Sequence, residues 1–215
     1  MHRSRVCGVG INDVYMDGML VSQTHQYQTW VSMLGRCYSA AYLAENPTYQ
    51  GCSVDHEWLR FSRFKQWMDS KRWEGLALDK DLKIPGNKIY SSNACLFIPQ
   101  WVNSLLSSLS PQKRALPTGV NMNKGRFAAK YKSFGKTIHI GLFGNAEDAH
   151  IAYRVHRLWE IKTRVNIYCD SAGADQDVCA ALLRLYENEA CKVRQYPPVV
   201  MRRRNSHERN CPCSA

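Results

Sequence analysis

Acidic and amide side chains gather in one short stretch of the sequence, LDKDLKIPGNKIYSSNACLFIPQWVN, which runs from Leu78 to Asn103. Asp79 and Asp81 share one side of an expected strand, a Gly-Asn turn and a second strand follow, and Asn103 lies on the next helix. Carboxylate and amide oxygens of this kind suit a hard divalent cation, which binds a few protein oxygens together with water and phosphate. The same aspartates would equally suit an ordinary strand-to-turn hairpin in which they cap backbone groups.

A proton acceptor is harder to find in this stretch. Lys80 lies between the two aspartates, and a lysine with an ordinary pKa of about 10.4 is protonated at neutral pH. His56, in SVDHEWLRF, neighbours Asp55 and Glu57, and a histidine beside carboxylates can accept a proton near neutral pH. His56 is therefore a candidate base, although it also suits a surface position at the start of a helix. Without it, either Asp81 or a metal-bound hydroxide would have to serve as the base.

The cysteines allow two interpretations. Nine cysteines without a CxxC pair favour reduced thiols over a disulfide framework. Three of them, with either Cys7 or His56 as a fourth ligand, could form a zinc site, although their spacing matches no standard ligand pattern; they are Cys37, Cys52 and Cys95. Buried structural thiols are the alternative.

Two segments farther along the chain, GRFAAKYK and KTIHIGL, alternate like strands joined by a glycine-containing turn. One face of this pair should be apolar, with Phe127, Ala129, Tyr131, Ile138, Ile140 and Leu142. The opposite face should be polar, with Arg126, Ala128, Lys130, Lys132, Thr137 and His139. The next segment begins with an Asn N-cap and two acids and should be a helix. It would cover the apolar face with Ala149, Ala152, Tyr153 and His156.

Positive charge is concentrated in this part of the chain. The 215-residue protein has a net charge of +11 and a pI of about 9.3, and residues 113–164 contain eleven Lys or Arg against three acids. Lys and Arg contacts with phosphates supply most of the sequence-independent affinity for nucleic acid. A solvated strand face is the alternative, but such faces normally mix both signs. The charge therefore favours a polyanionic partner.

Four regions are expected from the sequence. Residues 1–110 should form one module, with tryptophan-rich helices over 25–73 and the acidic hairpin with its helix over 76–110. A Ser/Pro-punctuated connection leads to a sheet-and-helix domain at 117–164. Residues 165–196 form a helical extension, and the basic residues 197–215 are expected to be disordered. The fold class is α+β. No apolar run approaches the ~20 residues of a membrane span and no secretory signal is visible, so we expect a cytoplasmic protein.

The segment GVNMNKGRFAAKYKSFGKTIHIGLFGNAEDAHIAYRVHRL resembles the ethylene-response-factor (Apetala-two) DNA-binding fold, a three-stranded antiparallel sheet packed on one helix. In that family the sheet lies in the major groove. The resemblance implies DNA contacts at matching positions, which are Asn121, Asn123, Arg126, Lys130, Lys132, Thr137 and His139. The last strand carries His139 where the family has a tryptophan.

The stretch around Asp79 resembles the HNH (His–metal finger) fold, a ββα-metal module. This resemblance implies Mg²⁺ or Mn²⁺ ligands at Asp79 and Asn103, a bracing Asn87 or Asn93, and a base position that falls on Lys80. Residues 27–163 together are similar to phage HNH-like homing endonucleases that carry a sheet domain of the kind described above. The residues of this chain that carry the similarity include Trp30, Arg36-Cys37-Tyr38, Pro47-Thr48-Tyr49, Trp58, Gly86-Asn87-Lys88 and Pro99-Gln100.

Three functions follow as hypotheses. The first is a phage-type endonuclease that cuts or nicks double-stranded DNA with a divalent metal, located in the host cytoplasm if phage-encoded. The second is a catalytically inactive DNA-binding protein that acts as a regulator or on host DNA processes. The third is an adaptor for an acidic protein partner, which the charge alone allows.

Overall fold

The computed structural model describes residues 5–15, 20–109, 115–133 and 135–196, and the predicted basic tail at 197–215 lies outside these residues. The chain divides into two compact units. Unit 1 contains residues 1–111 and 165–185, and unit 2 contains residues 112–164 and 186–215. The region 165–196, which we expected as a separate extension, is thus shared between the two units.

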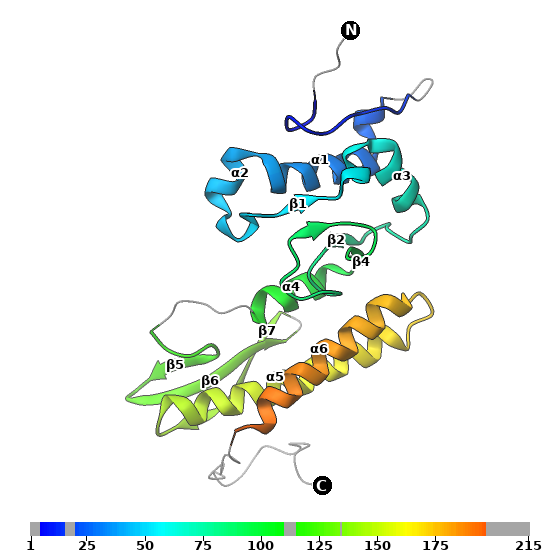
Figure 1. The fold of residues 1–215 in the computed structure, drawn as a ribbon. Coiled ribbons are helices and arrows are strands. Elements are labelled where there is room, and N and C mark those ends of the chain that lie inside the picture. Colours follow the sequence, from blue (N-terminus) through cyan, green and yellow to red (C-terminus); the bar gives the residue numbers. More distant parts are fainter. Residues whose placement is uncertain (1–4, 16–19, 110–114, 134, 197–215) are drawn as a thin grey trace. The chain divides into compact units, whose positions relative to one another are not determined.

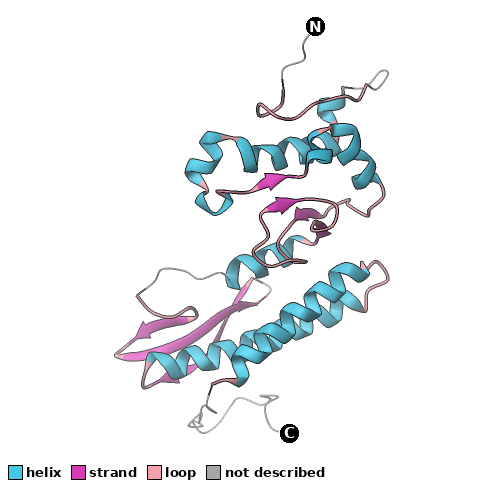
Figure 2. Ribbon diagram, viewed as in Figure 1, coloured by secondary structure: helices cyan, strands magenta, loops and turns pink. Residues whose placement is uncertain are grey.

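Short helices whose sequences are rich in aromatic residues occupy most of residues 21–69 of unit 1, and Figures 1 and 2 show these helices. They are η1 (Val21–Gln23), α1 (His25–Tyr38), α2 (Ala40–Glu45), η2 (Pro47–Tyr49), η3 (His56–Leu59) and α3 (Phe61–Asp69). Thr24 and Ser39 cap α1 and α2, each by accepting a backbone N–H in the first turn. Trp30, Phe61 and Phe64 are fully buried, and the Trp30 indole donates to the Trp58 carbonyl at 2.7 Å. The helical spacing of these aromatics therefore marks a core.

Two short two-stranded sheets and a helix complete the first 111 residues of unit 1. Strand β1 (Ser53–Val54) pairs in parallel with β3 (Ile89–Tyr90), and β2 (Ala77–Asp79) pairs antiparallel with β4 (Leu96–Ile98), which precedes α4 (Gln100–Leu109). The prediction that β2 and the strand after the Gly86-Asn87 turn pair as a simple hairpin is therefore wrong. The strand directly after the Gly86-Asn87 turn joins β1, and β2 finds its partner farther along the chain. Asp81 lies in a bend beyond β2 and not on the strand.

Unit 2 contains a three-stranded antiparallel sheet in the order β5-β6-β7 (Figure 1). The strands are β5 (Val120–Asn123), β6 (Arg126–Ser133) and β7 (Lys136–Phe143). Helix α5 (Ala146–Cys169) begins after Asn145, whose side chain accepts the Asp148 N–H at 2.8 Å as the predicted N-cap. Helix α6 (Gln176–Arg194) follows. Both helices contribute residues to both units.

One face of this sheet packs against α5, as predicted for Phe127, Ala129 and Tyr131. The core of unit 2 contains Val120, Ala129, Tyr131, Phe143, Ala149, Ala152 and Tyr153, with Phe127 and Ile140 packed against it. Alanines at the contact let the helix approach the sheet closely. This confirms the predicted core face of β6, whereas Ala128, on the opposite face, is also fully buried.

Strand β7 departs from the predicted alternation. The register shifts between Ala129 and Lys130, which pair with Gly141 and His139, so Ile140 is an extra residue in a β-bulge. Beyond the bulge Phe143 pairs with Phe127 on the core face, and Leu142 pairs with Ala128 on the opposite face. The predicted inward position of Leu142 is therefore wrong, because one inserted residue reverses the alternation of every residue after it.

Among the described residues, no helix combines the length and the apolar character that a membrane crossing requires.

Candidate nucleic-acid interface

The face of the sheet turned away from α5, here called the outer face, carries all the predicted DNA contacts. Cross-strand pairs fix this assignment, since residues that pair directly point to the same side. Lys130 pairs with His139, Lys132 with Thr137, and Arg126 with Asn123. The outer face consists of Asn121, Asn123, Arg126, Ala128, Lys130, Lys132, Thr137, His139 and Leu142.

The cations on and beside the outer face are not neutralised by acids. Arg126 and Lys132 are exposed and Lys130 is half-buried, while Lys124 and Lys136 are exposed at the ends of the strands. Within the part of the chain that the structure describes, no carboxylate forms an ion pair with any of these five. Their positive charges therefore add over one surface of unit 2.

The arginines of α5 have the opposite surroundings. Arg154 pairs with Glu189 at 2.8 Å. Arg157 and Arg164 both pair with Glu160, whose side chain is only 2% exposed. These carboxylates neutralise charge on the helical side of unit 2. The excess of cations counted from the sequence thus belongs largely to the sheet.

Arg126 is held in a defined orientation. Its Nη2 donates to the Leu142 carbonyl on β7 at 3.0 Å, so the guanidinium links β6 to β7, and among the described residues no second acceptor is bound to it. Asn121 and Asn123 place exposed amides on β5. Amides and guanidinium groups can contact base edges, and lysines can contact phosphates. The outer face therefore offers both types of contact.

Lys124 is a candidate contact that the sequence reasoning missed. Lys124 (φ 48°) and Gly125 (φ 76°) form the two-residue turn between β5 and β6, with positive φ at both positions as a type I′ hairpin requires. This geometry projects an exposed lysine from the tip of the hairpin. A Lys-Gly pair between two alternating segments was the signal for it in the sequence.

The predicted metal site is built differently. Asp79 is 9% exposed, and its Oδ1 accepts the backbone N–H of Asp81 at 3.0 Å and of Leu82 at 2.7 Å. Burial raises the pKa of this carboxyl and the nearby Asp81 charge adds to the rise, although the two hydrogen bonds oppose it. Asp79 thus performs the capping role that we considered as the alternative to metal binding.

Lys80, which the HNH resemblance would place at the base position, is 5% exposed. Its Nζ donates to Asp81 Oδ1 at 2.7 Å and to the Asn87 carbonyl at 2.9 Å. Asn87 braces the loop, because its amide donates to the carbonyls of Lys80 (3.1 Å) and Ile89 (2.7 Å). Asn93, the other candidate brace, is exposed.

Two further predicted site residues lie on η3 and α4. The His56 side chain is 85% exposed on η3, 3.3 Å from Asp55 and 3.2 Å from Glu57. Asn103 is half-buried in the first turn of α4. Across the described ranges no hydrogen bond joins either residue to Asp79, and no three His, Cys, Asp or Glu side chains are placed to hold a metal. The ammonium bound to Asp81 disfavours a divalent cation at that carboxylate, and Mg²⁺ or Mn²⁺ at Asp79 and Asn103 stays a prediction.

The three cysteines of the considered zinc site are buried thiols. Cys37, Cys52 and Cys95 are between 3% and 5% exposed and line the core of unit 1. Burial raises the pKa of Cys37 and of Cys95 to about 12. Zinc requires thiolates. These environments favour the structural alternative.

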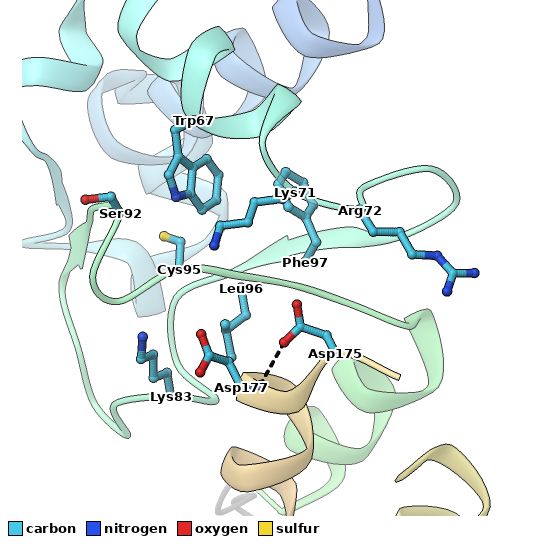
Figure 3. Close-up of a pocket in the computed structure, with 10 residues that line it drawn as sticks. All are labelled: Trp67, Lys71, Arg72, Lys83, Ser92, Cys95, Leu96, Phe97, Asp175 and Asp177. Atoms are coloured by element: carbon cyan, nitrogen blue, oxygen red, sulfur yellow. Dashed lines mark hydrogen bonds between the residues drawn. The ribbon is translucent and has the colours of Figure 1, made fainter. Parts of the chain in front are cut away.

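A pocket in unit 1 carries both signs of charge (Figure 3). Its lining residues are Trp67, Lys71, Arg72, Lys83, Ser92, Cys95, Leu96, Phe97, Asp175 and Asp177. Asp175 caps α6 by accepting the Asp177 N–H at 2.8 Å, and Arg72 donates to the Gly173 carbonyl at 2.7 Å. Because cations and carboxylates share this pocket, it favours no ligand of a single charge.

No protein-family model matches the chain, and no curated protein or solved structure is significantly similar to it. The resemblances drawn from the sequence therefore stay predictions.

Proposed function

We propose that this protein binds double-stranded DNA through the outer face of the β5-β6-β7 sheet. The observation that supports this most is the sorting of charge in unit 2. The predicted contact residues share one face without an acidic side chain, while the arginines of α5 are paired with Glu160 and Glu189.

Duplex DNA fits this surface physically. A cationic face gains affinity by releasing counterions from phosphates, which makes binding weaken as salt rises. A pair of antiparallel strands can enter the major groove, where amides and guanidinium groups meet distinct patterns of base-edge donors and acceptors. The resemblance of residues 119–158 to the ethylene-response-factor fold supports the same orientation of the sheet.

Binding without strand cleavage fits unit 1 better than the endonuclease hypothesis. Lys80, at the base position that the resemblance implies, is a buried cation, Asp79 caps backbone groups, and His56 is on the surface. We therefore propose that the β2, β4 and α4 segment serves as scaffold.

A charge-reversal experiment tests DNA binding. Lys130→Glu combined with Lys132→Glu should weaken binding to a short labelled duplex strongly in fluorescence anisotropy, and the unfolding midpoint should change little. Lys162→Glu, at an exposed cation of α5, is the matched control and should bind nearly as the wild type does. Equal loss in both variants would contradict an interface on the sheet. Binding that stays constant from low to moderate salt would contradict phosphate contacts altogether.

A nicking assay tests the choice between the first two hypotheses. Supercoiled plasmid incubated with the protein and Mg²⁺ or Mn²⁺ should remain supercoiled. Metal-dependent nicking that is lost in Asp79→Asn, a variant that keeps an oxygen acceptor for the two backbone N–H groups, would restore the endonuclease hypothesis.

A further inference from the structure

The Lys80 side chain is enclosed by the protein although DNA binding through the sheet makes no use of it. An ammonium is costly to remove from water unless good partners replace its hydration. Lys80 has two hydrogen-bond acceptors, Asp81 Oδ1 at 2.7 Å and the Asn87 carbonyl at 2.9 Å. Its Nζ also lies 5.9 Å from the centre of the Tyr49 ring and 5.7 Å from that of Tyr90, within the range of cation–π attraction.

These partners come from different segments of unit 1. Tyr49 belongs to η2, Asp81 to the bend after β2, Asn87 to the turn before β3, and Tyr90 to β3 itself. The contact with Asn87 is reciprocal, because the Asn87 amide donates to the Lys80 carbonyl at 3.1 Å while the Lys80 ammonium donates to the Asn87 carbonyl. The Lys80 side chain therefore connects both ends of the loop between β2 and β3, at Asp81 and Asn87, to Tyr49 of η2.

We propose that Lys80 is the structural cation of unit 1. Its ammonium holds the loop of residues 80–88 against Tyr49 of η2 and Tyr90 of β3, which is the organising role that a bound divalent ion would perform in a metal-dependent hairpin. The unit consequently reaches its folded state without metal. This inference concerns folding alone and does not rest on DNA binding.

Electrostatics supports this assignment over a hidden metal site. Asp81 is the acid nearest to solvent in the loop, with its side chain 46% exposed, and it is already paired with Lys80. A divalent cation bound there would face the Lys80 ammonium across a few ångströms, and like charges at that distance repel. The loop has a fixed positive charge instead.

Removing the ammonium tests the proposal. Lys80→Met keeps a long side chain and deletes the charge, and it should lower the thermal midpoint of tryptophan fluorescence by roughly 3–12 °C, the range expected for losing hydrogen bonds to a charged group. Trp30, Trp58, Trp67 and Trp73 lie in or against the core of unit 1, so this signal reports largely on that unit.

Lys88→Met is the matched control. Lys88 is in the same loop and also donates to two carbonyls, of Thr48 at 2.9 Å and Gln50 at 3.2 Å, but it is exposed. Its midpoint should move by less than about 2 °C. Equal effects of Lys80→Met and Lys88→Met would overturn the proposal.

A metal titration of the wild-type protein adds an independent test. Its midpoint should be the same in EDTA, MgCl₂ and MnCl₂, because ligands stabilise only the folded proteins that bind them. A rise with either cation would overturn the proposal. If Lys80→Met yields no folded protein, Asp81→Asn replaces it, and this variant should lower the midpoint by more than Lys88→Met does. A midpoint no lower than that of Lys88→Met would count against Lys80.

Discussion

Lysines in two regions of this chain have opposite surroundings. On the outer face of the sheet, Lys132 is exposed and no described carboxylate pairs with it. In unit 1, Lys80 is 5% exposed and is bound by a carboxylate, a carbonyl and two aromatic rings. The first cation is available to a polyanion, and the second is committed to the fold. Burial and the placement of acids decide which role a lysine has, and net charge alone does not.

The difference between Lys132 and Lys80 depends first on which face of the β5-β6-β7 sheet is covered by α5. Phe143→Ala should cost about 3–5 kcal/mol of unfolding free energy, because it empties a core position against α5. Leu142→Ala, on the outer face, should cost only about 1 kcal/mol, as expected for a half-buried side chain. Chemical denaturation of both variants gives the two values. The reverse order would place the lysines on the covered side.

The start of β5 offers a second test of the scaffold beneath the outer face. Gly119 has φ +84°, and a Cβ there would lie 2.1 Å from the Tyr153 ring, so Gly119→Ala should cost roughly 2–5 kcal/mol. Gly125 has φ +76° but open space around it, so Gly125→Ala should cost only about 1–2 kcal/mol. Denaturant midpoints of the pair separate the clash from the backbone strain. Equal losses would rule out the close approach of Tyr153.

Single lysine substitutions test the difference in role directly. Lys132→Met should weaken binding to all duplex sequences alike and reduce the slope of log affinity against log salt by about 1, since one phosphate contact is lost. Lys80→Met, measured at a temperature where it is folded, should leave that slope unchanged. Anisotropy titrations at several salt concentrations provide both slopes. A reduced slope for Lys80→Met would mean that its ammonium reaches DNA.

A half-buried histidine of unit 2 gives the smallest expected effect. Burial lowers the pKa of His156 below its ordinary 6.5, and its ring lies 6.2 Å from that of Tyr131. Between the lowered pKa and 6.5 the unfolded chain binds more protons than the folded chain, so stability is lost as the pH falls. The drop in midpoint between about pH 7.5 and about pH 5.5 should be smaller in His156→Phe than in the wild type. An identical drop in both would contradict this assignment.

The sequence was sufficient wherever a pattern is local. The alternation of Phe127, Ala129 and Tyr131 placed β6 correctly, and the Asn145 N-cap with its following acids located the start of α5. The aromatic spacing also identified the core of unit 1. These features depend on residues only a few positions apart.

Non-local features were beyond the same reasoning. The pairing of β2 with β4 skips over β3, which joins β1 from a distant segment, and no local pattern specifies such a choice. The burial of Lys80 depends on Tyr49 and Tyr90, which lie far from it or across a turn. Lysines are rarely buried, so the sequence predicted an exposed position for Lys80. The bulge at Ile140 was not predicted, because one extra residue does not change the residue types by which a strand is recognised.

That bulge has a consequence for how the protein can evolve. It separates β7 into a segment with Thr137 and His139 on the outer face and a segment with Phe143 in the core, each with its own alternation. Substitutions of Thr137 or His139 in the first segment should leave the hydrophobic packing of Phe143 in the second segment intact. Deleting Ile140 would remove the bulge and keep Leu142 and Phe143 on their present faces, whereas deleting a second residue would exchange them. Loss of the bulge should accordingly be tolerated in natural variants more often than any other change in the length of β7.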